Sequence, residues 1–297
     1  MDTTTAGFIG LGDMGERMAM RIAATGRPLF VFDPRAEPCV RLAGVGAHVV
    51  DNALDVARSA DVIGLCVVTT LQLHQIVHEM LPALDDSKTV LVHSSIPPDD
   101  VRDLARKVGA TGAGLLDAPV SGSRPAADAG TLTLIVGGEE SQIDRSLPTL
   151  QCYSTHIFRT GDVGTAQAMK IANNVMLHMN HLIALEALRF ATSQGIDEEL
   201  ALRIVNESTG RSWITEEWHV IDDMLVDHPQ AGTDGIYRMM SKEMWNAVVA
   251  AHPSMTPMPL TALGTQISKS SFQEREAVLS RRADQAIRRV PQPEHAR

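Results

Sequence analysis

Lys170 and Asn174 are the residues whose types and spacing most directly suggest a reaction. They stand four positions apart in the segment 164–174, so a helix would present both on one face. A lysine can take or give a proton, and Asn174 places an amide partner one helical turn from it. To act near neutrality such a lysine needs burial or a neighbouring cation, for which Lys242 is the candidate. The pair predicts acid/base chemistry at a substrate hydroxyl.

A glycine-rich loop near the start of the chain predicts a bound dinucleotide. It has the pattern G-x-G-x-x-G and lies between a predicted strand and a predicted helix. In that context the first glycine permits a tight turn, the second lets the backbone approach a pyrophosphate, and the third lets the helix pack on the strand. The free N–H groups of the helix would receive the phosphates. The residues of this predicted site are Gly10, Leu11, Gly12, Asp13, Met14 and Gly15.

Asp33 bears on which dinucleotide would bind. It follows the second predicted strand, 18 residues after Gly15, where an acid accepts hydrogen bonds from the ribose hydroxyls and repels a 2′-phosphate. This position favours NAD. Arg35 is close enough to receive a 2′-phosphate instead, and Asp33 could also be a simple turn residue before Pro34.

The order of the expected elements indicates how these residues are positioned. The first half alternates β-rich and helical runs, which predicts an α/β doubly wound, largely parallel sheet over 1–163. The second half reads as helices, so we predict an all-α domain over 164–297 that begins with a long interdomain helix at 164–194. The predicted strands are 7–9, 29–32, 47–50, 62–68, 90–93, 115–118, 132–136 and 156–158. The predicted helices include 15–24, 71–80, 98–108, 198–207, 213–225, 237–251, 259–268 and 272–289.

Within the long helix the apolar positions predict a mostly buried element. Asp197 is expected to cap the helix that follows. The apolar positions expected to be buried are Met169, Ala172, Met176, Ile183 and Leu185.

Composition excludes several classes of partner. A net charge of −10 disfavours nucleic acid, and 44% hydrophobic with 21% charged residues fits a globular protein. The apolar runs are too short to span a membrane. Three scattered cysteines form no CxxC pair, and the N-terminus has no secretion signal, so we expect a cytoplasmic protein.

Three segments together resemble the β-hydroxyacid dehydrogenase family, which contains 3-hydroxyisobutyrate dehydrogenase and tartronate semialdehyde reductase. They are residues 7–19, residues 117–138 and residues 164–174. A weaker match is Lys242-Glu243, where the family usually has Lys-Asp. The similarity runs from residue 6 to about residue 270.

The resemblance implies a Rossmann domain, a long connecting helix and an all-helical domain, assembled as a homodimer or homotetramer. It implies hydride transfer between a nicotinamide cofactor and a small carboxylated β-hydroxyacid or its semialdehyde. Lys170 would be the general acid/base, and Asn174 would hold the substrate beside it.

The resemblance also implies residues that bind the two ligands. Ser121 and Gly122 would bind the substrate carboxylate, which suits a turn of short residues that exposes backbone N–H groups. Ser95 would contact the cofactor near its ribose, and Lys242 would lie near the nicotinamide.

The chain departs from the family beside the substrate. Ser123 replaces a common glycine, and Arg124 after it could bind an anionic group or shape the loop from the surface. His178 continues the helix face of Lys170, either lining the pocket or serving as a structural histidine. We take Ser123, Arg124 and His178 as candidate substrate-binding residues.

Other functions stay open at this point. A short 6-phosphogluconate dehydrogenase-like enzyme would need more cations for a phosphate than Arg124 supplies. Imine reductases on this fold usually replace the lysine, which Lys170 argues against. A non-catalytic dinucleotide-binding or interaction protein would need neither Lys170 nor Asn174. His74 and His78 have the spacing of metal ligands but lack a third partner, so no metal site is predicted.

Overall fold

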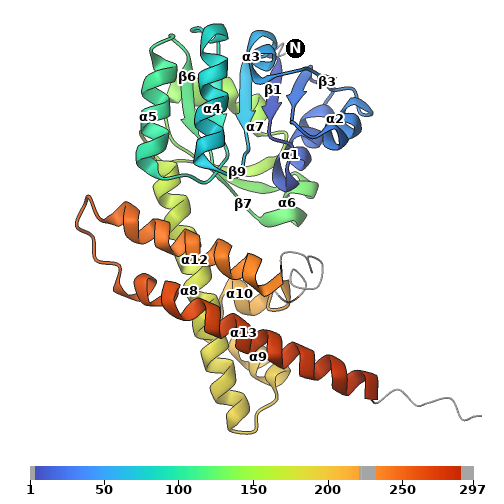
Figure 1. Ribbon diagram of the computed structural model, residues 1–297, viewed down its shortest axis with the longest axis vertical. Coiled ribbons are helices and arrows are strands. Elements are labelled where there is room, and N and C mark those ends of the chain that lie inside the picture. Colours follow the sequence, from blue (N-terminus) through green and yellow to red (C-terminus); the bar gives the residue numbers. More distant parts are fainter. Residues whose placement is uncertain (1–3, 221, 223–231, 289–297) are drawn as a thin grey trace, which may run out of the picture. The chain divides into compact units, whose positions relative to one another are not determined.

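Six parallel strands form the main sheet in the first part of the chain (Figure 1). Their order in the sheet is β3-β2-β1-β4-β5-β6, so the chain adds strands on one side from β1 to β3 and on the other side from β4 to β6. This change of side between β1 and β4 is typical of a doubly wound sheet. This confirms the α/β prediction. The computed structural model describes residues 4–220, 222 and 232–288. The strands are β1 (Ala6–Ile9), β2 (Leu29–Phe32), β3 (His48–Val49), β4 (Val62–Leu65), β5 (Thr89–Val92) and β6 (Gly114–Asp117).

Side chains that alternate along each strand fill two separate cores, because successive residues of a strand point to opposite faces. Ala6 and Phe8 of β1 pack with α1 and α2 in one core, whereas Ile9 packs with α3, α4 and α5 in the other. Both faces of the sheet are therefore covered, and only strand ends and loops remain to bind ligands. The helices are α1 (Asp13–Ala23), α2 (Ala36–Ala43), α3 (Ala53–Ser59), α4 (Thr70–Met80) and α5 (Pro98–Gly109), with a 3₁₀ turn η1 (Leu81–Ala83) after α4.

A second sheet of three strands follows the first. Its order is β7-β8-β9, with β7 antiparallel and β9 parallel to β8. The strand predictions at 29–32 and 132–136 match β2 and β8, whereas β7 was not predicted. The elements are β7 (Val120–Ser121), α6 (Ser123–Ala129), β8 (Leu132–Val136), α7 (Glu140–Leu150) and β9 (Ser154–Arg159).

The strand predicted over 62–68 is shorter than expected. It ends at Leu65, and Val68 is 84% exposed. Val67 uses both backbone groups on the side chain of Ser94, donating to its Oγ at 2.8 Å and accepting from it at 2.9 Å. Those groups are therefore not paired with a neighbouring strand.

The residues that the structure describes after β9 are mostly helical. By its contacts the chain divides into two units, Met1–Lys170 and Ile171–Arg297, whereas the sequence pattern sets the boundary at 163/164. Gly264 allows close packing in the second unit, since a Cβ there would lie 2.7 Å from the Met179 sulfur. None of the described helices has both the length and the apolar character needed to cross a bilayer. The helices are α8 (Thr165–Ser193), α9 (Glu198–Asn206), α10 (Trp213–Glu216), α12 (Gly232–Ala251) and α13 (Pro259–Arg288).

Several details of the helical prediction were wrong. The helix predicted over 213–225 is interrupted by a turn at 217–219, after which residues 220 and 222 are again helical; residues 221 and 223–225 lie outside the described residues. The helices predicted at 259–268 and 272–289 are one helix, α13, because no glycine or proline interrupts 269–271; residue 289 is again outside the described range. Asp197 caps α9 as expected, accepting from the N–H of Leu200.

The burial expected along α8 was also wrong, apart from Leu185, which is 5% exposed. Ala172 is exposed, and Met169, Met176 and Ile183 are 48%, 65% and 59% exposed. At about 100° per residue these four share the side of the helix opposite Leu185. The helix is apolar on two sides, and only one of them meets the core.

Candidate active site

The glycine loop connects β1 to α1, and its first and last glycines are required by packing. Gly10 has φ +89°, and a Cβ there would lie 2.3 Å from the carbonyl oxygen of Cys66. A Cβ on Gly15 would lie 1.9 Å from the Gly10 oxygen. Gly12 faces open space, with nothing within 4 Å of such an atom. The backbone is thus bare where a ligand would approach the start of α1, which fits a pyrophosphate.

Two neighbours of these glycines are arranged differently. Leu11 is 1% exposed and part of the core, and Met14 is half-buried against it. The backbone N–H of Leu11 donates to Asp33 at 2.7 Å. The loop is thereby held to the end of β2.

Asp33 lies just after β2 and is 8% exposed. Burial raises the pKa of its carboxyl, but hydrogen bonds from the Arg35 side chain and from the N–H groups of Arg35 and Leu11 outweigh it, so the pKa lies below its ordinary value. Arg35 donates to both carboxylate oxygens, at 2.9 and 3.0 Å, and to the Leu11 carbonyl. Asp33 is therefore an ionised group that already holds a cation.

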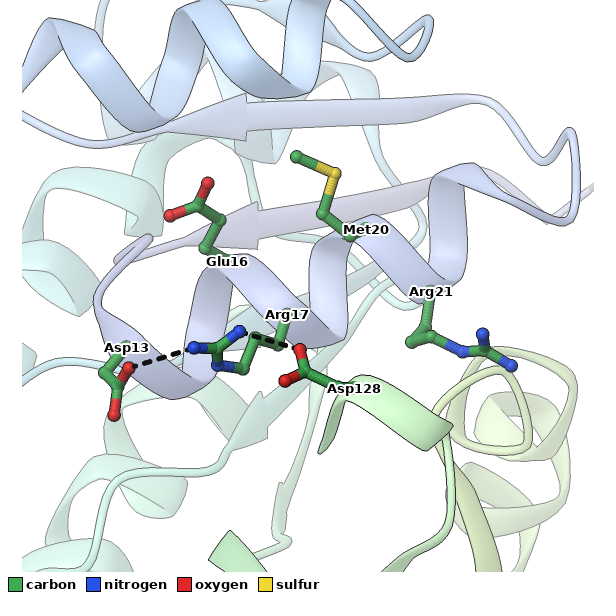
Figure 2. Close-up of a pocket in the computed structure, with 6 residues that line it drawn as sticks. All are labelled: Asp13, Glu16, Arg17, Met20, Arg21 and Asp128. Atoms are coloured by element: carbon green, nitrogen blue, oxygen red, sulfur yellow. Dashed lines mark hydrogen bonds and ion pairs between the residues drawn. The ribbon is translucent and has the colours of Figure 1, made fainter. Parts of the chain in front are cut away.

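Ion pairs connect the start of α1 to α6. Figure 2 shows Arg17 between Asp13 and Asp128, with nitrogen–oxygen distances of 3.6 and 2.7 Å. Asp13 also accepts from Nε of Arg124 at 2.6 Å. Arg124 therefore binds the glycine-loop helix, and these pairs hold the segment after Ser121 against α1.

The segment Ser121–Ser123 forms the turn between β7 and α6. Gly122 has φ +127° and Ser123 has φ +54°, so two successive residues lie in the left-handed region. Ser123 is unusual there because it is not glycine, and such strain is typical of binding sites. Ser121 is half-buried, while Gly122 and Ser123 are exposed. Gly122 and Ser123 are therefore accessible to solvent in a turn of short residues.

Lys170 lies half-buried in the second turn of α8. The start of this helix is held by the fully buried carboxylate of Asp117, which accepts from the N–H groups of Gly164 and Gln167, both at 2.9 Å. Burial raises the pKa of Asp117, and these hydrogen bonds oppose that rise. Ser95, at the carboxyl end of β5, is exposed.

Asn174 belongs to a hydrogen-bonded group in the second unit. Its amide nitrogen donates to Oε2 of Glu243 at 2.9 Å, and Nε2 of His178 lies 2.7 Å from the same oxygen. His178 is 3% exposed, and Lys242 is exposed. The structure therefore brings together Asn174, His178 and Glu243. Glu243 was not predicted as a site residue, although the Lys242-Glu243 match pointed to its position.

The two spaced histidines of α4 do not belong to a metal cluster. Among the described residues, no three His, Cys, Asp or Glu side chains are arranged to hold a metal ion. Glu79, next to His78, instead accepts from the N–H of Ala53 at the start of α3.

The doubly wound sheet, the open Gly12 and the acid after β2 define a dinucleotide-binding protein. Two family models match the chain. One is described as the NAD binding domain of 6-phosphogluconate dehydrogenase and matches residues 5–161. The other is described as the NAD-binding region of NADP-dependent 3-hydroxyisobutyrate dehydrogenase and matches residues 164–288. The chain belongs to the β-hydroxyacid dehydrogenase family, as the resemblance predicted, and is an NAD(P)-dependent hydroxyacid dehydrogenase.

Similar proteins span nearly the whole chain. The mitochondrial 3-hydroxyisobutyrate dehydrogenase of Drosophila melanogaster is 34% identical over 89% of this chain and 83% of its own length. The 2-(hydroxymethyl)glutarate dehydrogenase of Eubacterium barkeri is 31% identical over 88% and 87%. A solved structure of Mycobacterium tuberculosis 3-hydroxyisobutyrate dehydrogenase with L-serine has a TM-score of 0.78 at 26% identity, covering 91% of this chain and 94% of that one.

Proposed function

We propose that this enzyme transfers hydride between nicotinamide and a small β-hydroxyacid or its semialdehyde, with Lys170 as the general acid/base. When bound, the nicotinamide would supply the hydride acceptor for oxidation and the hydride donor for reduction. Lys170 takes the hydroxyl proton in oxidation and returns it in reduction. The observation that carries the proposal is that Lys170 and Asn174 lie one turn apart on α8, within the family's catalytic segment.

What the similar proteins share supports a narrower substrate class. The names of two of them contain 3-hydroxyisobutyrate and 2-(hydroxymethyl)glutarate, and the solved structure of the third contains L-serine. Each of these molecules carries a hydroxymethyl group on the carbon that bears a carboxylate. In this chain the turn Ser121–Ser123 would bind the carboxylate, and Asn174 would orient the hydroxymethyl beside Lys170. The third substituent on that carbon would set the specificity, and we assign its recognition to Ser123 and His178.

A phosphorylated substrate is disfavoured. Arg124 is the cation nearest to the carboxylate turn in the sequence, and it is bound to Asp13. A phosphate would have to displace that pair, which argues against a 6-phosphogluconate dehydrogenase-like activity.

The same reasoning favours NAD over NADP. The ionised Asp33 repels a 2′-phosphate, and Arg35, the cation that could receive it, is held by Asp33. Ser95 and Lys242 are assigned to the ribose and nicotinamide parts of the cofactor.

A second copy of the chain is the proposed protein partner. Met169, Met176, Ile183 and Phe190 are between 48% and 69% exposed and recur every seven residues along α8. This spacing forms one seam on a helix. A twofold axis that passes between Met176 and Ile183 would pack Met176 of one copy against Ile183 of an antiparallel second copy. This arrangement forms a closed dimer.

Free thiols at Cys39, Cys66 and Cys152 fit a reducing compartment such as the cytoplasm.

Lys170→Met tests the function. We expect loss of turnover by at least about a hundredfold, with NAD binding retained in a fluorescence titration. Lys107→Met is the matched control, since Lys107 is an exposed lysine paired with Asp103 on α5. A panel of 2-substituted 3-hydroxypropionates, run with NAD and NADP in parallel, tests the substrate class. Undiminished turnover in Lys170→Met would rule out the proposed mechanism.

A further inference from the structure

The first turn of α8 is attached to the carboxyl ends of three adjacent strands, and Gln167 makes most of the attachment. Its side chain is fully buried. Nε2 donates to the carbonyl of Ser94 at 2.8 Å, and Oε1 accepts from the N–H of Ile96 at 3.2 Å. Both partners follow β5. One amide thus satisfies a backbone donor and a backbone acceptor on either side of Ser95.

The backbone of the same residue is attached to β6. The N–H of Gln167 donates to Asp117 at 2.9 Å, and Asp117 is the last residue of β6. Ser94 extends the attachment to β4, because its hydroxyl both accepts from and donates to the backbone of Val67. The carboxyl ends of β4, β5 and β6 are therefore connected through two side chains and one helix turn.

We infer that Gln167 is a positioning residue that holds Lys170 at a fixed distance from the cofactor-binding edge of the sheet. This inference rests on the proposed role of Lys170. Lys170 follows Gln167 by three residues, so the two occupy the same face of α8, about 4.5 Å apart along the axis. Asn174 continues that face. Movement of the first turn would therefore be passed directly to the proton acceptor.

The buried polar contacts make this attachment specific. A buried amide must find partners for both of its ends, and here each end has one backbone partner in the loop that contains Ser95. An apolar side chain of similar size would fill the volume but leave the Ser94 carbonyl and the Ile96 N–H unpaired. The helix would still pack against the core, but its first turn would no longer be fixed relative to the loop 94–96.

The experiment compares Gln167→Met with a control in the same helix turn, Thr165→Val, which removes a hydroxyl bonded to the Asp162 carbonyl and to the Thr160 hydroxyl. Rates are expressed per NAD-binding site found by titration, so that misfolded protein does not count. We expect Gln167→Met to lower kcat about 10- to 100-fold, because misplacement by about 1 Å has effects of this size. Rates are compared at saturating NAD, because the loop that Gln167 holds contains Ser95, which we assign to the cofactor ribose. Thr165→Val should retain its kcat.

A double variant separates positioning from general destabilisation. If Gln167 acts through Lys170, adding Gln167→Met to Lys170→Met should not lower the residual rate further. If Gln167→Met folds poorly, Gln167→Glu keeps the acceptor for Ile96 and, as the neutral acid that burial favours, a donor for the Ser94 carbonyl, and should lower kcat less.

The outcomes distinguish the two claims. If Gln167→Met and Gln167→Glu both have a normal kcat while Lys170→Met is inactive, the positioning role is overturned and the proposed function is not. An equal loss from Gln167→Met in the presence and absence of Lys170 also overturns it. Full turnover in Lys170→Met overturns the proposed function, and the positioning role with it.

Discussion

The amide nitrogen of Asn174 donates to the carboxylate of Glu243 over 2.9 Å. A carboxylate only accepts, so His178, 2.7 Å from the same oxygen, donates from Nε2. The amide oxygen of Asn174 accepts from Asn173 at 3.2 Å and has a second lone pair with which it could accept from a substrate hydroxyl. Glu243 thereby sets the orientation of the residue that would hold the substrate.

We therefore expect Glu243→Ala to lower kcat/KM for the hydroxyacid about tenfold or more, since a charge-assisted hydrogen bond contributes about 1.5–3 kcal/mol. Glu243→Gln keeps an acceptor oxygen and should lose less. Steady-state kinetics with saturating NAD measures both. Equal losses in the two variants would show that charge, and not orientation of Asn174, is what matters.

Asp33 should control the choice of cofactor. Asp33→Ser removes the charge that repels a 2′-phosphate and releases Arg35 to bind one. We expect kcat/KM for NADP to rise about 10- to 100-fold and that for NAD to fall. Asp55→Ser, which breaks a surface pair with Arg58 on α3, is the control. An unchanged ratio of the two cofactors would contradict the assignment of Asp33.

Acid should destabilise the first unit through His93. Burial lowers its pKa to about 4, although its hydrogen bond to the Ala118 carbonyl acts in the opposite direction. The ring lies between Phe8 and Tyr153 and stays neutral when folded. The unfolded state takes up a proton on His93 near pH 6.5, whereas the folded state does not. The contribution of the neutral ring to the free energy of unfolding is therefore fully present above that pH and decreases as the pH falls toward 4, by about 3 kcal/mol in total.

Urea unfolding at several pH values between 7.5 and 4.5 would measure this loss. His93→Gln should be less stable at pH 7.5 but should show a shallower decline below pH 6.5. A decline remains, because burial also lowers the pKa of His181 to about 4. An identical pH slope in wild type and His93→Gln would exclude His93 as a source of acid sensitivity.

The exposed seam on α8 should mediate self-association. Ile183→Glu places a charge near the proposed twofold axis, and we expect sedimentation velocity to show a smaller species than the wild type. Val40→Glu, at a 69% exposed position on α2, is the control and should sediment as the wild type does. A wild-type chain that sediments as a monomer would end the proposal.

Local patterns predicted the parts of this fold that depend on local sequence. The glycine loop, the cap at Asp197 and the strand β8 follow from residue type and spacing. Glu243, Gln167 and Asp117 owe their roles to hydrogen bonds between residues far apart in the chain, and no local pattern reports these. The burial of α8 could not be predicted either, because periodicity does not distinguish an apolar side that meets the core from one that faces solvent.

The two sides of α8 constrain how its length can change. At about 100° per residue, Gln167, Lys170, Asn174 and His178 share one side, and the seam from Met169 to Phe190 occupies the opposite one. Inserting a single residue after Lys170 would turn everything downstream by about 100° and misalign Asn174 and the seam together. Only insertions or deletions close to whole heptads would keep both in place. Among homologues, length variation should therefore fall in the loops that border α8 and be rare inside it.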